Sequence, residues 1–92
     1  MIQTFADTET EALFRTGKSR QWKSIARTAV RRMQALDFAG AMEDLKNPPG
    51  NRLERLKGDR KGQWSIRINE QFRFCFRWEG KDAWDVEIVD YH

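Results

Sequence analysis

The apolar residues follow two different periods, which divide the chain into a helical half and a strand half. Over residues 22–36 they recur at intervals of three and four, so that they fall on one face of a helix. After residue 63 the period changes to two, with apolar and polar side chains alternating over 64–68, 72–78 and 84–88. We expect a helix followed by three antiparallel strands, whose apolar face is buried under the helices while the other face stays open.

A second, shorter helix is expected near the N-terminus. Asp7 or Thr8 can cap its first turn, the helix extends to about Arg15, and Gly17 ends it. Residues 2–5 just before it predict a short strand.

The segment 47–50, Asn-Pro-Pro-Gly, separates the two halves, because two prolines and a glycine stop a helix and form a turn. Residues 41–46 before it can form one last helical turn. In a chain of 92 residues, each half is too short to hold a core of its own. We therefore expect one α+β domain over residues 1–92, with a small antiparallel-rich sheet and the N-terminal helices packed on one face.

The register of the first hairpin can be predicted, because it must keep the apolar side chains of both strands on the same face of the sheet. A three-residue loop over 69–71 pairs Ile66 with Phe74 and keeps every apolar side chain on the same side. The same register sets Arg67 opposite Arg73, although like charges at opposed positions destabilise a sheet. Such a pair suggests a role in binding an anion.

Charge is unevenly distributed along the chain. The net charge is +3, and residues 18–36 contain six basic side chains and no acid. Residues 52–67 contain six more basic side chains against two acids. This distribution favours an anionic partner. The single cysteine rules out an internal disulfide, no apolar run reaches the about 18 residues of a membrane span, and the N-terminus lacks a secretory pattern. We expect a cytoplasmic protein with no membrane partner.

Arginines line the polar side of the predicted sheet. Arg67, Arg73 and Arg77 share this face, and guanidinium groups hold phosphate through paired hydrogen bonds. An ordinary solvated face is the alternative. Cys75 alternates onto the same face, where a small thiol is more typical of packing than of a nucleophile.

Two further basic segments can bind RNA. The loop 56–62 contains two glycines and three cations, Lys57, Arg60 and Lys61, but it lacks the spacing of a P-loop. In the main helix the basic side chains lie opposite the apolar face, at Arg20, Lys23, Arg27 and Arg31. A solvated surface explains both segments equally well, although the absence of acids in the helix favours RNA or an acidic protein.

His92 is the only histidine, and its ordinary pKa suits proton transfer at neutral pH. It follows the last predicted strand directly, so the fold can hold it near the polar face. Terminal histidines are more often bystanders than catalysts.

Four segments together resemble a known family. They are Met1-Ile2-x-Thr4-Phe5, the run from Leu56 to Ile66 (LKGDRKGQWSI), Phe72-Arg73-Phe74-x-Phe76 and the final Asp90-Tyr91-His92. This combination resembles HigB-type toxins of the RelE-like group of bacterial toxin–antitoxin systems. The resemblance implies a RelE-like microbial RNase fold and a ribosome-dependent mRNA endonuclease that works in the aminoacyl site. It also implies a helix-turn-helix antitoxin of the HigA type, and operator DNA bound only through the complex with it.

The family's chemistry uses no metal or other cofactor. A ribose 2′-hydroxyl attacks the adjacent phosphate and leaves a 2′,3′-cyclic phosphate and a 5′-hydroxyl. By resemblance, Arg73 and Lys57 stabilise charge, His92 acts as an acid or base, Asp90 orients it or shares the proton transfer, and Tyr91 stacks on a base or donates a hydrogen bond.

Glu54 departs from the pattern, because some members carry a histidine three residues before the lysine. A carboxylate can act as a base but cannot stabilise negative charge, so the division of acid and base roles stays open. RNA binding is assigned to eight further basic residues on the predicted helix stripe, the loop 56–62 and the polar face of the sheet: Arg20, Lys23, Arg27, Arg31, Arg60, Lys61, Arg67 and Arg77. Two alternatives remain, namely an inactive or weak toxin homologue kept for antitoxin and operator binding, and an α+β interaction module without catalysis.

Overall fold

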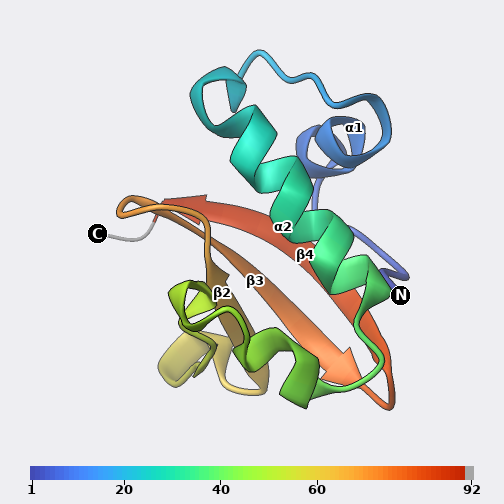
Figure 1. Cartoon of the computed structure of the whole chain (residues 1–92), viewed down its shortest axis with the longest axis vertical. Coiled ribbons are helices and arrows are strands. Elements are labelled where there is room, and N and C mark those ends of the chain that lie inside the picture. The colour runs from blue at the N-terminus through green and yellow to red at the C-terminus, as the bar shows by residue number, and fades with distance from the viewer. Residues whose placement is uncertain (91–92) are drawn as a thin grey trace.

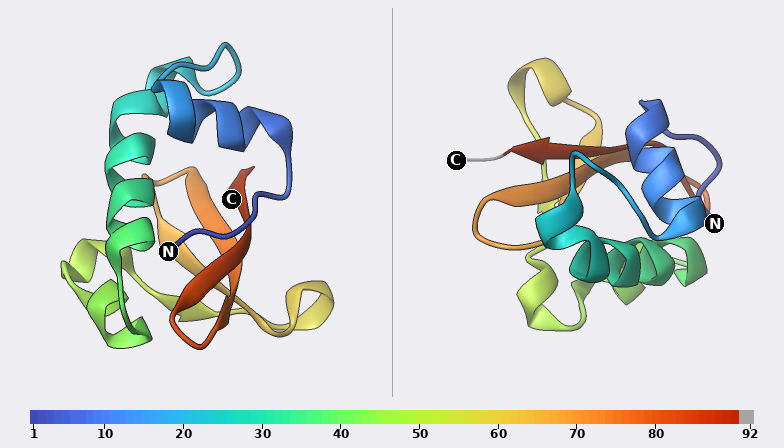
Figure 2. Two further views of the ribbon diagram at one scale, coloured as in Figure 1. Left: turned by 90° about the vertical axis from the view of Figure 1, so that its right-hand side faces the viewer. Right: turned by 90° about the horizontal axis from the view of Figure 1, so that it is seen from above.

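The computed structural model describes residues 1–90 and contains two helices and a four-stranded antiparallel sheet in the order β1-β2-β3-β4 (Figure 1). The elements are α1 (Thr8–Thr16), α2 (Ala26–Phe38), β1 (Glu54–Arg55), β2 (Gln63–Arg67), β3 (Phe72–Glu79) and β4 (Asp82–Asp90). Single 3₁₀ turns lie at Lys23–Ile25, Met42–Lys46, Pro49–Asn51 and Gly58–Arg60. Both helices lie on one side of the sheet, with α1 across the end of α2 (Figure 2). This arrangement confirms the expected α+β class.

The short helix α1 begins and ends where the sequence predicts. The Asp7 carboxylate accepts a hydrogen bond of 2.7 Å from the backbone N–H of Thr10, which satisfies one of the free donors of the first turn. Gly17 ends the helix in a left-handed conformation with φ of 75°. Leu13 is fully buried and fixes the helix on the core.

Helix α2 begins four residues later than predicted. Ser19 Oγ accepts the backbone N–H of Trp22, and a 3₁₀ turn over 23–25 leads into the helix at Ala26. The ring of Trp22 still joins the core, because it packs edge-on against Phe72 at 5.3 Å. The apolar spacing therefore identified the buried residues correctly but placed the helix start too early.

The predicted hairpin register is confirmed. Ile66 pairs with Phe74 and Arg67 pairs with Arg73, as the three-residue loop requires. Ile66 and Phe74 have no exposed surface and lie in the core cluster with α2. The polar and apolar faces of the sheet are thereby fixed for the whole of β2 and β3.

Trp84 was expected on the apolar face, and this was wrong. The pairing of β3 with β4 shifts between Cys75 and Arg77, where Asp85 takes a left-handed conformation with φ of 56°. Beyond this bulge Ala83 is fully buried opposite Trp78, while Trp84 pairs with Arg77 on the polar face. One extra residue has reversed the alternation.

The N-terminal segment forms two isolated parallel bridges to β4 in place of a regular strand. Ile2 pairs with Ala83 and Phe5 pairs with Val86. Four backbone hydrogen bonds of 2.7–3.1 Å join residues 1–6 to β4. The N-terminal segment is thus held along the free edge of β4.

The polar face of the sheet was expected to be open, and this was also wrong. Ser65 and Cys75 on that face have no exposed surface. Arg60, from the turn after β1, reaches across to Glu87 of β4 at 3.1 Å. The segment from residue 52 to residue 62 supplies β1, a fourth strand that the alternation did not show. In the described residues 1–90, no helix is long and apolar enough to cross a bilayer.

Candidate active site

A pocket of about 350 Å³ lies on the polar face of the sheet. Its walls are Arg52, Glu54, Arg67, Asn69, Glu70 and Arg73. Three of these residues, Glu54, Arg67 and Arg73, are site residues that the sequence predicts. The pocket carries three guanidinium groups and two carboxylates, so its formal charge favours an anion.

Arg73 is the most constrained residue in the pocket. Only 7% of its surface is exposed, and its Nε donates to Ser65 Oγ at 2.9 Å. Its Nη2 donates to the backbone carbonyl of Arg52, and its Nη1 lies 3.8 Å from Glu54 Oε1. A buried guanidinium held by several acceptors has a fixed orientation before any ligand arrives, which is the condition for strong electrostatic stabilisation.

Arg67 and Arg73 are opposed in the sheet, yet their side chains bond to different groups. The Nε of Arg67 donates to the backbone carbonyl of Asn69 at 3.0 Å. Asn69 in turn accepts the backbone N–H groups of Gln71 and Phe72 through its side chain, at 2.8 and 2.7 Å. The hairpin loop therefore orients one arginine while Ser65 and Arg52 orient the other.

Arg52 was not predicted from the sequence. It has φ of 45° and ψ of 57°, a left-handed conformation that non-glycine residues seldom adopt. Such backbone strain is found most often at functional sites, where the surrounding structure maintains it. The Pro-Pro-Gly turn before it was the only local signal of an unusual backbone.

Lys57 and Asp90 do not line this pocket. Lys57 is exposed and borders a separate, mostly apolar pocket of about 310 Å³ beside Arg55 and Lys61. Asp90 pairs with Phe72 and accepts a hydrogen bond of 3.1 Å from Gln71 Nε2. The structure therefore brings two of the four described catalytic candidates, Arg73 and Glu54, to one wall. Tyr91 and His92 lie outside the described residues.

Two arginines that were predicted to bind RNA make ion pairs within the fold. Arg60 donates to Gln63 Oε1 at 3.0 Å and to Glu87 at 3.1 Å. Arg77 contacts Asp85 at 2.8 Å and Glu79 at 3.1 Å.

The hydrogen bond between Arg77 and Asp85 changes the pKa of both groups. It lowers the pKa of the Asp85 carboxyl and raises the already high pKa of the Arg77 guanidinium. Both ionised forms are favoured, so this pair stabilises the bulge in β4.

Cys75 lies on the polar face of the sheet, near the charged groups of Arg60, Glu87 and Arg73. Burial raises the pKa of its thiol, while the positive charges of Arg60 and Arg73 oppose that shift. A fully buried, protonated thiol is a packing group, as the sequence predicts.

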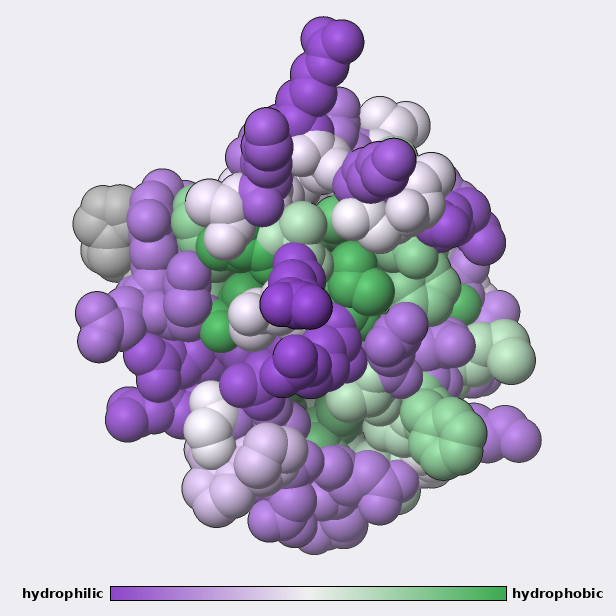
Figure 3. All heavy atoms as spheres, turned by 45° about the horizontal axis from the view of Figure 1, so that its top comes forward, coloured by the Kyte–Doolittle hydropathy of each residue, from purple (hydrophilic) through white to green (hydrophobic). Residues whose placement is uncertain are grey.

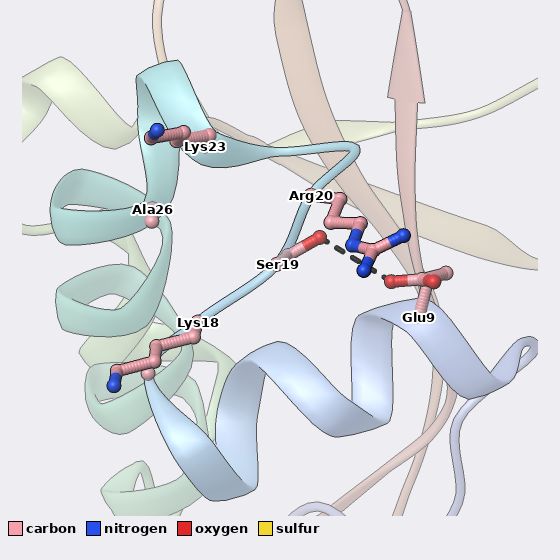
Figure 4. Close-up of a pocket in the computed structure, with 7 residues that line it drawn as sticks. Glu9, Lys18, Ser19, Arg20, Lys23 and Ala26 are labelled. Carbon is pink, nitrogen blue, oxygen red and sulfur yellow. Dashed lines mark hydrogen bonds between the residues drawn. The ribbon is translucent and has the colours of Figure 1, made fainter.

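The predicted basic stripe is exposed along the start of α2 and the segment before it. Arg20 and Lys23 border a hollow of about 680 Å³ between α1 and the start of α2, together with Lys18 and Glu9 (Figure 4). Ser19 on its wall donates to Glu9 at 3.3 Å. In the space-filling view, hydrophilic side chains project around patches of apolar surface (Figure 3).

Arg27 and Arg31 continue the stripe along α2, and both are exposed. All four predicted cations of the stripe therefore face solvent, and none of them lines the pocket that contains Arg73.

Two curated bacterial proteins are similar to this chain. The toxin HigB-1 of Vibrio cholerae serotype O1 is 49% identical over 55 residues, which cover 60% of this chain and 58% of that protein. The endoribonuclease HigB of Proteus vulgaris is 39% identical over 61 residues, which cover 66% of this chain and 65% of that protein. The matched region thus spans less than two thirds of each relative.

Solved structures share the fold at low sequence identity. A chain of the heterotetrameric YoeB–YefM toxin–antitoxin complex from Staphylococcus aureus has a TM-score of 0.58 and 14% identity, covering 100% of this chain and 98% of its own. The YoeB/ParE toxin from Agrobacterium tumefaciens has a TM-score of 0.52 and 21% identity, covering 98% of each chain. At these identities the likeness shows the fold alone.

A family model matches almost the whole sequence. It describes the RelE-like toxin of the type II toxin–antitoxin system HigB, and it matches residues 3–92. Since this range is nearly the whole chain, the protein belongs to the HigB-like family of RelE-like toxins.

Proposed function

We propose that this chain is the toxin of a type II toxin–antitoxin system and acts as a ribosome-dependent endoribonuclease on mRNA in the aminoacyl site. The observation that carries the proposal is the buried guanidinium of Arg73, held in one orientation on the wall of a positively charged pocket. A positively charged pocket can stabilise the negative charge on the five-coordinate phosphorus that forms during phosphodiester cleavage.

The proposed reaction needs no metal and no other cofactor. The ribose 2′-oxygen bonds to the adjacent phosphorus while the bond from phosphorus to the 5′-oxygen breaks. A base takes the proton of the 2′-hydroxyl, and an acid protonates the departing 5′-oxygen. The products are a 2′,3′-cyclic phosphate and a 5′-hydroxyl.

Arg73 stabilises the charge on phosphorus, with Arg67 binding the neighbouring phosphate from the same wall. Lys57, on the adjacent loop, contacts the RNA beside the scissile bond. Among the described wall residues, Glu54 is a carboxylate within 3.8 Å of Arg73 and can accept the 2′-proton. His92 is the other candidate for acid or base, with Asp90 and Tyr91 beside it in sequence.

The proposed partners follow the family. An antitoxin neutralises the toxin, which the complexes among the fold neighbours support. We propose that this antitoxin is of the HigA type, that it binds DNA by a helix-turn-helix, and that the toxin meets operator DNA only through it. The substrate is mRNA on translating ribosomes, which places the activity in the cytoplasm.

One observation favours a second candidate, a weak or inactive homologue that serves in antitoxin and operator binding. Arg73 links Ser65 of β2 to the Arg52 carbonyl and to Glu54, which is a structural role, and Glu54 occupies a position where some relatives carry a histidine. An arginine that only holds the sheet to the preceding loop needs no RNA.

Cleavage of translated mRNA on purified ribosomes tests the first proposal, with cut sites mapped at the new 5′ ends. The parent chain should cut, and Arg73→Ala should slow cutting about 100- to 1,000-fold, the loss typical of removing one donor to a developing oxyanion. Arg15→Ala is the matched control, because Arg15 is an exposed arginine on α1 that pairs with Glu11. Intact mRNA with the folded parent chain would favour the second candidate.

A further inference from the structure

Asn51 is a buried polar residue for which the proposed reaction has no use. It is 2% exposed and lies in the turn that follows Pro48 and Pro49. Its Nδ2 donates to the carbonyl oxygens of Leu45 and Asn47, each at 3.2 Å. Buried amides are retained where their hydrogen bonds fix a particular local structure, because an unpaired one is costly.

The same side chain connects this turn to the helical layer. Asn51 Oδ1 accepts a hydrogen bond from Arg32 Nη1, and Arg32 is a residue of α2. Both polar atoms of the amide are therefore engaged, one by the turn and one by the helix. The turn cannot move relative to α2 without breaking this hydrogen bond.

The next residue reaches the pocket. Arg52 has the left-handed backbone described above, and its carbonyl accepts Nη2 of Arg73 while its side chain lines the pocket wall. A left-handed arginine persists only when neighbouring contacts maintain it. The contacts run without interruption from Arg32 through Asn51 and Arg52 to the guanidinium of Arg73.

We propose that Asn51 is a positioning residue that sets the orientation of Arg73 for stabilising the charge on the phosphorus during cleavage, with Arg32 as its anchor. The inference rests on the proposed function, since it assigns Asn51 to the same site. Without the amide, the turn relaxes, the Arg52 carbonyl moves, and the guanidinium of Arg73 loses one of the acceptors that orient it. A residue that merely stabilises the fold would leave Arg73 in place.

The test uses two variants of the full chain, Asn51→Ala and Arg32→Ala, each with a matched control. Thr10→Ala also truncates a fully buried, hydrogen-bonded polar side chain, but it lies in α1, away from the pocket. Lys46→Ala also removes a cation near the turn, but Lys46 is exposed and pairs with Glu43. Thermal melting shows whether all four variants are folded at the assay temperature.

The first measurement is independent of activity. Solvent exchange of the Arg73 Nη2–H protons, followed by NMR in the free protein, should be faster in Asn51→Ala and Arg32→Ala than in the two controls. Thr10→Ala should lower Tm without changing this exchange. Equal exchange in Asn51→Ala and in the parent would overturn the proposal, whatever the protein does to RNA.

The second measurement separates chemistry from binding. On ribosomes, Asn51→Ala should lower the maximal cleavage rate by up to about 100-fold, the loss associated with a displacement of about 1 Å, at an unchanged half-saturating toxin concentration. In an Arg73→Ala background the same substitution should cause no further loss. An additive loss there would refute action through Arg73. Absence of cleavage by the parent would refute the proposed function, and the NMR result would still decide the role of Asn51.

Discussion

At the scale of single residues, Cys75 shows what alternation can and cannot reveal. The period of two placed its side chain on the face of Arg67 and Arg73, and the pairing in the sheet confirms that placement. Its complete burial depends on the segment from residue 52 to residue 62, which lies far from it in sequence. Burial, not local pattern, raises the pKa of the thiol.

Native Cys75 should therefore react slowly with a disulfide reagent. Because burial disfavours the thiolate and blocks access, labelling at pH 7 should be slow in the folded protein and complete within the mixing time in denaturant. Absorbance of the released aromatic thiol measures both rates. Rapid labelling of the folded protein would contradict the packing role.

Asp85 should make stability depend on acidity. Its pKa is lowered below the ordinary value of 3.8 by the hydrogen bond from Arg77, so its ionised form stabilises the folded protein. That contribution is fully present above pH 3.8 and is lost as the pH falls through the lower pKa of the folded state.

Asp85→Asn should consequently lower Tm at pH 7, and the difference from the parent should shrink below pH 3.8. Asparagine tolerates the left-handed backbone at this position, so strain is not introduced. Thermal melting across this range provides the comparison, with the exposed Asp59→Asn as control. A Tm difference independent of pH would show that the ion pair is not the cause.

At the scale of elements, the helix cap of α1 gives the most direct prediction. Asp7→Ala removes the acceptor for the backbone N–H of Thr10 and should lower the free energy of unfolding by about 1 kcal/mol. Asp7→Asn keeps an oxygen acceptor and should cost less. Urea unfolding measures both changes, and equal losses would show that charge, not capping, is responsible.

The elements that could be predicted are those specified by local pattern. The cap at Asp7, the terminating Gly17 and the pairing of Ile66 with Phe74 are each encoded within a few residues, and all three are confirmed. The bulge at Asp85 could not be seen, because the residues around it keep an apparent alternation while the pairing shifts by one. Trp84 was therefore assigned to the wrong face.

At the scale of the whole molecule, the site was predicted only in part. Arg73, Arg67 and Glu54 share a pocket as the pattern and the resemblance suggested. Arg52, which lines the pocket, and Asn51, the proposed positioning residue, were missed because they lie in a turn whose contacts reach a helix and a strand distant in sequence. Arg60 and Arg77 form ion pairs with Glu87 and Asp85, which the alternation alone did not predict.

Ribosome binding should depend, through charge alone, on the exposed basic stripe that runs from the segment before α2 into the helix. Replacing Lys23 and Arg27 with alanine should weaken binding and flatten its salt dependence by about 0.7–0.9 in logarithmic slope for each phosphate that is no longer bound. Cleavage at saturating toxin should be unchanged, because the stripe does not line the pocket of Arg73. Filter binding at several salt concentrations tests this, with Arg15→Ala as control. An unaltered slope would remove the stripe from the RNA interface.

The burial of Arg73 has a consequence for how toxicity can be lost. One guanidinium joins β2, the strained turn at Arg52 and the edge strand that carries Glu54. Escape mutants altered at this position should therefore also be less stable, and cellular proteases would remove part of the protein. Non-toxic variants selected from a random library would include some with defective catalysis and others with only a low amount of folded protein. The two kinds can be separated by measuring the activity per folded molecule.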